Sequence, residues 1–534
     1  MWTSRLKRVL LFLLALLAFI VSCGARAATP AATRRTVTGE QGTASVVASR
    51  ATLEQATAAS EITLAASPSA GATPAEPTPA PTSLPCATAS LAPQASSGTS
   101  FYVAPDGSPD GDGSLARPWD LATALAQPAA VQPGDTIWLR GGAYSGIFRS
   151  DLTGLPNTPI TVRSYPREWA VIDTQAQTDD GDNFIVQGSW ANYRDLELTN
   201  TRTSNRSGSG FVFAGNSQHN KFVNMIIHDL GNNTFRDGNE IYGSILYNNG
   251  VDGSGNAHQL YTQNDDPGNP VRIVDSIVFN GFAFGMHAYA GGVGQLRGIQ
   301  MIGSVWFNSG AAQSETGYRK DNILVGGVNG AEEILLQENM TWAFSGRERN
   351  VALGRYYEQN GAVTLLDNYL VGEDAFYNTW QPATMADNTF FIFDGGDSNV
   401  DAAHFPDNEY RNTPPHQNRV FIRPNIYEPG RAHIVVYNWE LRDSVQIDLR
   451  GLLLEGDSYE VRNAQNYFAP PVAAGTYQGQ PVTLRLAGLQ PAQPIGPGLI
   501  EPSEYTGKSF NVFVLLRTGS APAATVFMPI VSRR

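Results

Sequence analysis

Ser244-Ile-Leu-Tyr, Leu260-Tyr-Thr-Gln, Ser276-Ile-Val-Phe and Met286-His-Ala-Tyr follow one another between residues 244 and 289. Each segment combines β-branched, aromatic or other apolar residues with a few polar ones, as short β-strands do. Segments that begin with a small polar residue recur at intervals of roughly 20 to 35 residues, a period typical of stacked units. They begin at Asp195, Asn224, Ser244, Ser276, Ser304, Asn339, Asn368 and Asn388.

A second set of short apolar segments lies between the members of the first. It begins at Phe184, Phe211, Phe235, Leu260, Met286, Ile323, Val351 and Phe376. Each repeat therefore supplies at least two strands, none of which can bury its apolar face alone. Stacked turns bury a continuous inner stripe, so the repeats predict a parallel β-solenoid. The alternative is a β-propeller, but its blades need about 40 residues each, and the spacing is too short for them.

The repeats and their Asn-bearing turns resemble the right-handed parallel β-helix of the pectate lyase-like superfamily, which includes polysaccharide lyases. The segments Phe101-Tyr-Val-Ala-Pro-Asp-Gly and Leu121-Ala-Thr-Ala-Leu also resemble the entry turn of extracellular β-helix proteins. In that turn a short helix covers the open end of the solenoid, whose first strands have no neighbour above them. The resemblance implies a right-handed parallel β-helix over residues 99–407.

The C-terminal part of the chain has a different pattern. Residues 417–519 contain short alternating segments such as His433-Ile-Val-Val-Tyr, separated by Gly and Pro turns, which predicts an antiparallel β-sandwich. This part resembles accessory domains of carbohydrate-active enzymes. Residues 520–534 form a short tail. The predicted fold class is all-β, with a parallel β-helix followed by a sandwich.

The N-terminal part of the chain predicts export. Basic residues precede an apolar run from Val9 to Val21 that is too short to span a bilayer as a mature helix. Because the run ends at Ile20-Val-Ser-Cys23, which resembles a bacterial lipobox, residues 1–23 are predicted to be a lipoprotein-type signal peptide. Residues 24–98 are rich in Ala, Thr and Pro and predict a disordered tether. We expect an extracellular protein anchored at the cell surface through a lipid on Cys23; free secretion after Ala27 is the alternative.

Charge and cysteine content narrow the range of partners. The 534 residues carry a formal net charge of -13, which argues against binding nucleic acid or an anionic membrane surface. Membrane contact is therefore expected only through the lipid anchor. The two cysteines, Cys23 and Cys86, lie outside the solenoid, so disulfides do not hold it together. We expect a monomer whose partner, as the resemblance implies, is a polysaccharide.

Alternation along the two central strands predicts which side chains face outward. If Leu260 and Met286 fill the core, Tyr261, Gln263, His287 and Tyr289 point out, and in-register stacking places Tyr261 beside His287 about 4.8 Å away. Further polar residues flank these strands. Arg236 lies one turn earlier, His258 and Asn264 border the first strand, and Arg319 and Lys320 end the loop that precedes the next strand.

These residue types match the needs of β-elimination in a polysaccharide of uronic acids. The reaction requires a group to neutralise the sugar carboxylate, a base for the C5 proton and an acid for the leaving oxygen. We predict His287 or Lys320 as the base and Tyr261 as the acid, with His258 beside them. Arg236, Gln263, Asn264, Tyr289 and Arg319 are predicted to bind the substrate.

Two other functions remain as alternatives, and Ca²⁺ is a possible cofactor. A glycoside hydrolase would use a carboxylate pair such as Asp265 with Asp266, or Asp237 with Glu240. A cell-surface glycan-binding or adhesion scaffold would need no chemistry at all. The resemblance to lyases that bind Ca²⁺ through Asp residues makes Asp265 and Asp266 candidate ligands for Ca²⁺, although they do not form a complete cluster.

Overall fold

The computed structural model describes residues 98–175, 182–202, 209–214, 217–251, 258–291, 296–312, 320–343, 350–355, 359–394, 401–495 and 506–520. The chain divides into two compact units, residues 1–90 and 91–534, and all described residues belong to the second. Cys23, with the predicted signal peptide, nearly all of the predicted tether and most of the C-terminal tail, lies outside the described residues. Within the described residues, no helix is long and apolar enough to cross a membrane.

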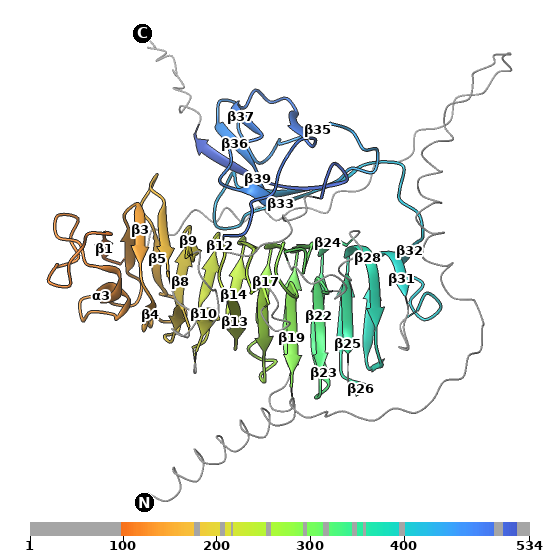
Figure 1. Ribbon diagram of the computed structural model, residues 1–534, viewed down its shortest axis with the longest axis horizontal. Helices are drawn as coiled ribbons and strands as arrows, with labels where there is room; N and C mark the ends of the chain where they lie inside the picture. Colours follow the sequence, from red (N-terminus) through yellow and green to blue (C-terminus); the bar gives the residue numbers. More distant parts are fainter. Residues whose placement is uncertain are drawn as a thin grey trace, which may run out of the picture. The chain divides into compact units, whose positions relative to one another are not determined.

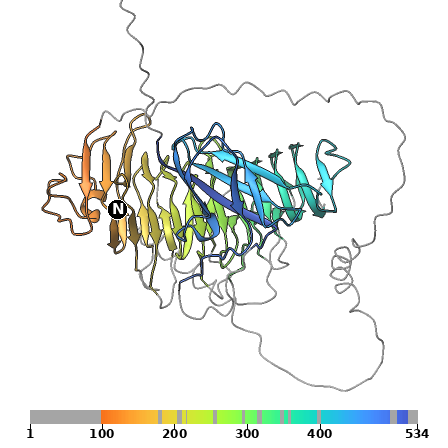
Figure 2. The ribbon, with the colours of Figure 1, turned by 90° about the horizontal axis from the view of Figure 1, so that it is seen from above.

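The β-helix is built from three ladders of parallel strands, and Figures 1 and 2 show the strands stacked along its axis. The first ladder, called sheet A, has 11 strands. They are β1 (Ser100–Val103), β2 (Thr136–Leu139), β5 (Ile160–Ser164), β8 (Ala191–Arg194), β11 (Lys221–Val223), β14 (Glu240–Tyr242), β17 (Val271–Val274), β20 (Leu296–Ile302), β23 (Ala331–Gln337), β27 (Val363–Leu366) and β30 (Ala383–Ala386).

The second ladder comprises β3 (Gly142–Ser145), β6 (Ala170–Asp173), β9 (Glu197–Thr199), β12 (Ile226–His228), β15 (Ile245–Tyr247), β18 (Ile277–Phe279), β21 (Val305–Phe307), β24 (Met340–Trp342), β28 (Tyr369–Phe376), β31 (Thr389–Asp394) and β32 (Glu409–Arg411). The third comprises β4 (Phe148–Ser150), β7 (Phe184–Val186), β10 (Ser209–Phe213), β13 (Asn232–Arg236), β16 (Leu260–Gln263), β19 (Met286–Ala290), β22 (Ile323–Gly327) and β25 (Val351–Arg355). The long β28 joins both ladders, because Tyr369 pairs with Met340 and Phe376 with Leu353. A short parallel pair, β26 (Gln359–Asn360) and β29 (Thr379–Trp380), extends this end.

The small polar residue that begins each repeat holds the turns in register. Ser276 Oγ accepts a hydrogen bond from the backbone N–H of Ser244 at 3.2 Å, and Ser304 Oγ accepts one from Ser276 at 3.1 Å. Asn residues continue the ladder, with Asn368 Oδ1 2.9 Å from the backbone nitrogen of Asn339. All of these side chains are buried. The ladder thus pairs buried backbone donors where the chain leaves one strand and enters the next.

The interior of the solenoid is one continuous apolar core, and a short helix covers its first turn. Inward residues of all three ladders, such as Ile241, Leu246 and Leu260, are fully buried in it. Helix α3 (Leu121–Leu125) begins at Asp120, whose carboxylate accepts a hydrogen bond from the Thr123 N–H at 2.7 Å. The helix lies where the resemblance to the entry turn of β-helix proteins predicted a capping helix.

The C-terminal part is antiparallel, as predicted. A five-stranded sheet runs in the order β33 (Arg419–Pro424), β34 (Ala432–Tyr437), β39 (Phe510–Gly519), β36 (Ser458–Asn463) and β37 (Ala473–Thr476). A two-stranded sheet, β35 (Ser444–Ile447) with β38 (Val482–Arg485), packs on it around a separate core, and η1 (Ala464–Asn466) follows β36. The predicted fold class, a right-handed parallel β-helix followed by an antiparallel β-sandwich, is therefore confirmed.

The sandwich buries the outer face of the second ladder. Phe307 and Trp342 lie against Phe510 with ring centres 5.2 Å apart in each case, within one apolar cluster that spans both parts. Arg423 also forms an ion pair with Asp275 at 2.7 Å. Because this ladder is covered, the outer faces of sheet A and of the third ladder are the places where a long substrate can bind.

Candidate active site

Strands β16 and β19 of the third ladder pair in the predicted register. Tyr261 lies opposite His287, between the pairs Leu260 with Met286 and Thr262 with Ala288. Those four flanking residues are completely buried, whereas Tyr261 and His287 are partly exposed. The predicted alternation is confirmed, and both candidate side chains, Tyr261 and His287, belong to the outer face.

A row of outward side chains runs across five turns beside this pair. Arg236 lies opposite Gln263, and the Gln263 side chain reaches the carbonyl oxygen of Tyr289 at 2.9 Å. Tyr289 lies opposite Gly326, which in turn lies opposite Arg355. With about 4.8 Å between turns, two arginines thus stand about 19 Å apart along the axis. We call Arg236, Tyr261, Gln263, His287, Tyr289 and Arg355 the Tyr–His face.

Hydrogen bonds fix the position of the Tyr261 phenol. Its hydroxyl donates to the Tyr289 carbonyl oxygen at 3.0 Å and accepts from Gln263 Nε2 at 2.8 Å. Burial raises the pKa of the phenol, while Arg236 and Gln263 act in the opposite direction. Tyr261 is therefore protonated at neutral pH and can donate a proton.

His287 is held from behind by a second histidine. Its Nδ1 lies 2.8 Å from Nε2 of His258, and its ring stacks on Tyr289 with centres 4.9 Å apart. Burial lowers the pKa of His287 to about 3, assisted by the positive charges of Arg355 and Lys320. The imidazole is neutral at pH 7. Within the described part of the chain, its Nε2 has no hydrogen-bond partner.

The structure changes the roles expected for His258 and Lys320. His258 is only 2 % exposed, so its ring is not presented on the outer face; it instead holds the His287 ring in position through their hydrogen bond. Lys320 is 4 % exposed, with its ammonium 5.4 Å from the centre of the Phe284 ring, which stacks on His287. Lys320 thus influences His287 electrostatically from below the surface, and His287 is better placed to be the base.

Asn264 and Arg319 stand apart from the other predicted binding residues. Asn264 is buried, and its amide donates to the backbone carbonyl oxygens of Asp266 at 2.9 Å and of Asn269 at 3.2 Å. Its side chain therefore supports the turn after β16 and is turned away from substrate, which corrects the prediction. The turn bends the chain inward there, so strand alternation no longer applies. Arg319 lies outside the described residues.

Two carboxylates near β16, Asp265 and Asp266, are the predicted Ca²⁺ ligands. Asp265 and Asp266 are exposed, and an Asp266 oxygen accepts a hydrogen bond from the Gly268 N–H at 2.9 Å. Asp237 lies one turn earlier. Burial raises the pKa of its carboxyl group, the charge of Arg236 lowers it, and the charges of Asp265 and Asp266 raise it further. No group of three or more His, Cys, Asp or Glu side chains in the described residues is arranged to hold a metal ion. Binding of Ca²⁺ by Asp265 and Asp266 therefore stays a prediction.

The carboxylate pair Asp237 and Glu240 is divided between two surfaces. Asp237 follows β13 beside Asp265 and Asp266. Glu240 begins β14 on sheet A, where it forms ion pairs with Lys221 at 3.0 Å and Arg272 at 3.1 Å. Since glycosidase carboxylates must flank one bond, this pair does not fit the hydrolase mechanism.

Two residues at this face, Arg355 and Phe284, are not among the predicted site residues. Arg355 forms an ion pair with the buried Asp321 at 3.3 Å and continues the outward row. Phe284 stacks on His287 with ring centres 4.8 Å apart. Arg355 ends the strand segment that begins at Val351, so strand alternation could have placed it on the outer face. Phe284 lies in a turn, where alternation gives no prediction.

Comparison with known proteins supports the fold. Residues 101–266 match the family model described as Pel9A-like, right handed beta helix region, so the predicted resemblance to pectate lyase-like β-helix proteins is confirmed. The chain is similar in structure to pectate lyase Pel9A, with 19% identity, coverage of 57% of this chain and 82% of the other, and a TM-score of 0.39.

Two other solved structures match over a similar share of this chain. A rhamnogalacturonan lyase matches with 14% identity, 59% and 87% coverage and a TM-score of 0.41. A GH136 lacto-N-biosidase from Eubacterium ramulus matches with 13% identity, 59% and 68% coverage and a TM-score of 0.33. No curated protein matches the sequence. Such distant likenesses say nothing about the activity of this chain.

Proposed function

We propose that this chain is an extracellular polysaccharide lyase that cleaves a polymer of uronic acids by β-elimination at the Tyr–His face. One observation carries the proposal. Tyr261 and His287, a protonated phenol and a neutral imidazole, lie side by side on the outer face with ring centres 5.7 Å apart. A general acid and a general base are thus presented together, in a row that has an arginine at each end.

The row suits a substrate that lies along the solenoid axis. Arg236 is exposed and Arg355 is partly exposed, so both guanidinium groups can bind sugar carboxylates. Gly326 lies between Tyr289 and Arg355 and adds no side chain to the row. A polymer of uronic acids carries a carboxylate on each unit, so successive units can place an anion beside exposed Arg236 and another beside Arg355, which already pairs with Asp321.

The chemistry follows from the positions of the two rings. Nε2 of His287 takes the proton from C5, the electron pair of that C–H bond forms the C4–C5 double bond, and the C4–O bond breaks toward the glycosidic oxygen. That oxygen receives the phenolic proton of Tyr261, whose hydroxyl turns from the Tyr289 carbonyl to the leaving group. A new reducing end and an unsaturated sugar result.

The environment of His287 makes its basicity depend on substrate. Burial first, and then the charges of Arg355 and Lys320, lower its pKa in the free protein. A sugar carboxylate bound beside Arg355 opposes these positive charges, which raises the pKa of the imidazole when the substrate is in place. Proton acceptance is thereby coupled to binding of an anionic sugar.

Location and anchoring at the cell surface through Cys23 are part of the same proposal and are supported by the lipobox. The proposal is tested by offering the protein polyuronides and neutral glycans and measuring which are shortened. We expect shortening of a polyuronide and no reaction with neutral glycans. If only a neutral glycan were shortened, the result would contradict the lyase proposal. Binding without shortening would favour a glycan-binding scaffold.

A further inference from the structure

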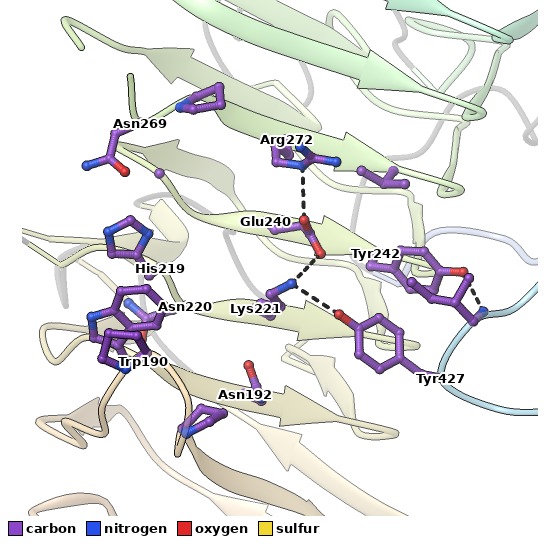
Figure 3. Close-up of a pocket in the computed structure, with 16 residues that line it drawn as sticks. Trp190, Asn192, His219, Asn220, Lys221, Glu240, Tyr242, Asn269, Arg272 and Tyr427 are labelled. Atoms are coloured by element: carbon purple, nitrogen blue, oxygen red, sulfur yellow. Dashed lines mark hydrogen bonds and ion pairs between the residues drawn. The ribbon is translucent and has the colours of Figure 1, made fainter. Parts of the chain in front are cut away.

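A cleft on the outer face of sheet A is separate from the Tyr–His face. It has a volume of about 710 Å³ and lies over β8, β11, β14 and β17, bordered by Ile426 and Tyr427 from the segment that follows β33 (Figure 3). This volume is within the range of about 300 to 1,000 Å³ of small-molecule sites. The site described above uses none of the residues that line it.

Two aromatic side chains form one wall of the cleft. Trp190 and His219 occupy equivalent positions on successive turns, immediately before Ala191 and Asn220, and their rings stack with centres 4.0 Å apart (Figure 3). Both have positive φ, 60° for Trp190 and 59° for His219. This backbone region favours Gly, Asn and Asp, so a tryptophan there is held at a conformational cost.

Three side chains of the wall and floor carry polar atoms that pair with no other described residue. Within the described residues, neither the Trp190 indole nitrogen, the His219 ring nitrogens nor the Asn192 amide has a hydrogen-bond partner. Burial lowers the pKa of His219, so its imidazole is neutral at pH 7 and offers one donor and one acceptor. A ligand with many hydroxyl groups can pair with all three side chains.

The floor of the cleft is a row of charges in register. Lys221 lies opposite Asn192 and Glu240, and Glu240 lies opposite Arg272. Lys221 Nζ is 3.0 Å from Glu240 and 3.1 Å from the Tyr427 hydroxyl. Two cations thus share one carboxylate, so the floor has a net charge of about +1 in a protein whose formal net charge is -13. The excess cation favours an anionic ligand.

We infer that this cleft is a second, non-catalytic binding site for a uronic-acid oligosaccharide. The stacked rings contact the apolar face or edge of a pyranose, the free polar atoms bind its hydroxyls, and Lys221 and Arg272 bind its carboxylate. Among the described residues that line the cleft, the only carboxylate is that of Glu240, and its ion pairs with Lys221 and Arg272 make it a poor base. The choice of uronic acid, but not the existence of the site, rests on the proposed function. A chain bound here is held on the protein while another segment reaches the Tyr–His face.

The test compares matched tryptophan variants. Trp190→Asn removes the indole and places a residue that tolerates positive φ, so the turn is retained. Trp138→Asn is the control, because Trp138 is also a partly exposed residue of sheet A but lies outside the cleft. Binding of a hexamer of α-1,4-linked galacturonate is measured by calorimetry for both variants and the parent, with a neutral hexamer of β-1,4-linked glucose beside it.

We expect Trp190→Asn to weaken binding of the galacturonate hexamer at one of two sites by about tenfold or more, while Trp138→Asn binds like the parent. On long polyuronide, Trp190→Asn should raise KM and leave kcat unchanged. Equal binding by the two variants would overturn the site, and equal binding of the neutral hexamer would overturn its ligand class. Calorimetry does not need turnover, so it separates failure of this site from failure of the lyase proposal.

Discussion

His228 makes part of the stability of this protein dependent on pH. Its Nδ1 lies 2.7 Å from a carboxylate oxygen of Asp229, its Nε2 lies 3.0 Å from one of Glu197, and the ring stacks on Tyr247. Burial by itself lowers the pKa of the imidazole, but the hydrogen bonds to the two carboxylates outweigh it and raise the pKa to about 9. Asp229 also accepts a hydrogen bond from the Ile495 N–H at 2.7 Å, so the ring supports the contact with the C-terminal part.

The size of the effect follows from the difference between folded and unfolded pKa values. An unfolded histidine titrates near about 6.5, so a folded pKa of about 9 corresponds to about 3 kcal/mol of stabilisation. Because the folded pKa is the higher one, this contribution is complete below about pH 6.5 and is lost as the pH rises through 9.

Urea denaturation between pH 6 and pH 10 measures this contribution directly. We expect the free energy of unfolding to fall by about 3 kcal/mol more in the parent than in His228→Gln, which cannot become charged. His404→Gln is the control, since His404 is exposed and its ion pair with Asp401 lies at the surface. Parallel pH profiles for the parent and His228→Gln would show that the His228 ion pairs do not contribute to stability.

Three further outcomes follow. Tyr261→Phe should lower kcat on a cleaved polyuronide by about 10² to 10⁴ and leave the melting temperature unchanged. His287→Ala should lower kcat similarly and also cost about 1 to 3 kcal/mol of stability, because it leaves buried His258 without its hydrogen-bond partner. Full activity of either variant would place the chemistry elsewhere. Asn368→Ala should destabilise the protein in urea by more than Asn368→Ser, since Ser fills the equivalent position in other turns, and equal midpoints would show that the polar ladder is dispensable. Cys23→Ala should move the protein from the membrane fraction to the medium, and an unchanged distribution would favour free secretion.

The Tyr–His face was predictable where strand alternation applies. Leu260 and Thr262 on one strand, and Met286 and Ala288 on the next, left a single register that kept Tyr261 and His287 outside. His258 and Asn264 lie just beyond a strand end, where the chain bends, and both turn inward. Strand alternation says nothing about such positions, so their inward orientation could not be predicted.

The covered face of the second ladder could have been predicted from strands whose consecutive residues are all apolar. Ile245, Leu246 and Tyr247 are consecutive and all buried, as are the three residues of β18 and of β21. A strand with no polar side is buried on both faces, and the sandwich supplies the second cover. The sheet A cleft had no such signal, because it needs Tyr427, which is far along the chain, to approach Lys221.

The products of a single digestion distinguish β-elimination from hydrolysis. Unsaturated ends are measured by ultraviolet absorbance and new reducing ends by a chemical assay on the same polyuronide sample. Each β-elimination event forms one unsaturated end and one new reducing end, so we expect a ratio of one throughout the reaction. A neutral glycan in place of the polyuronide should yield neither product. New reducing ends without ultraviolet absorbance would show hydrolysis and contradict the account.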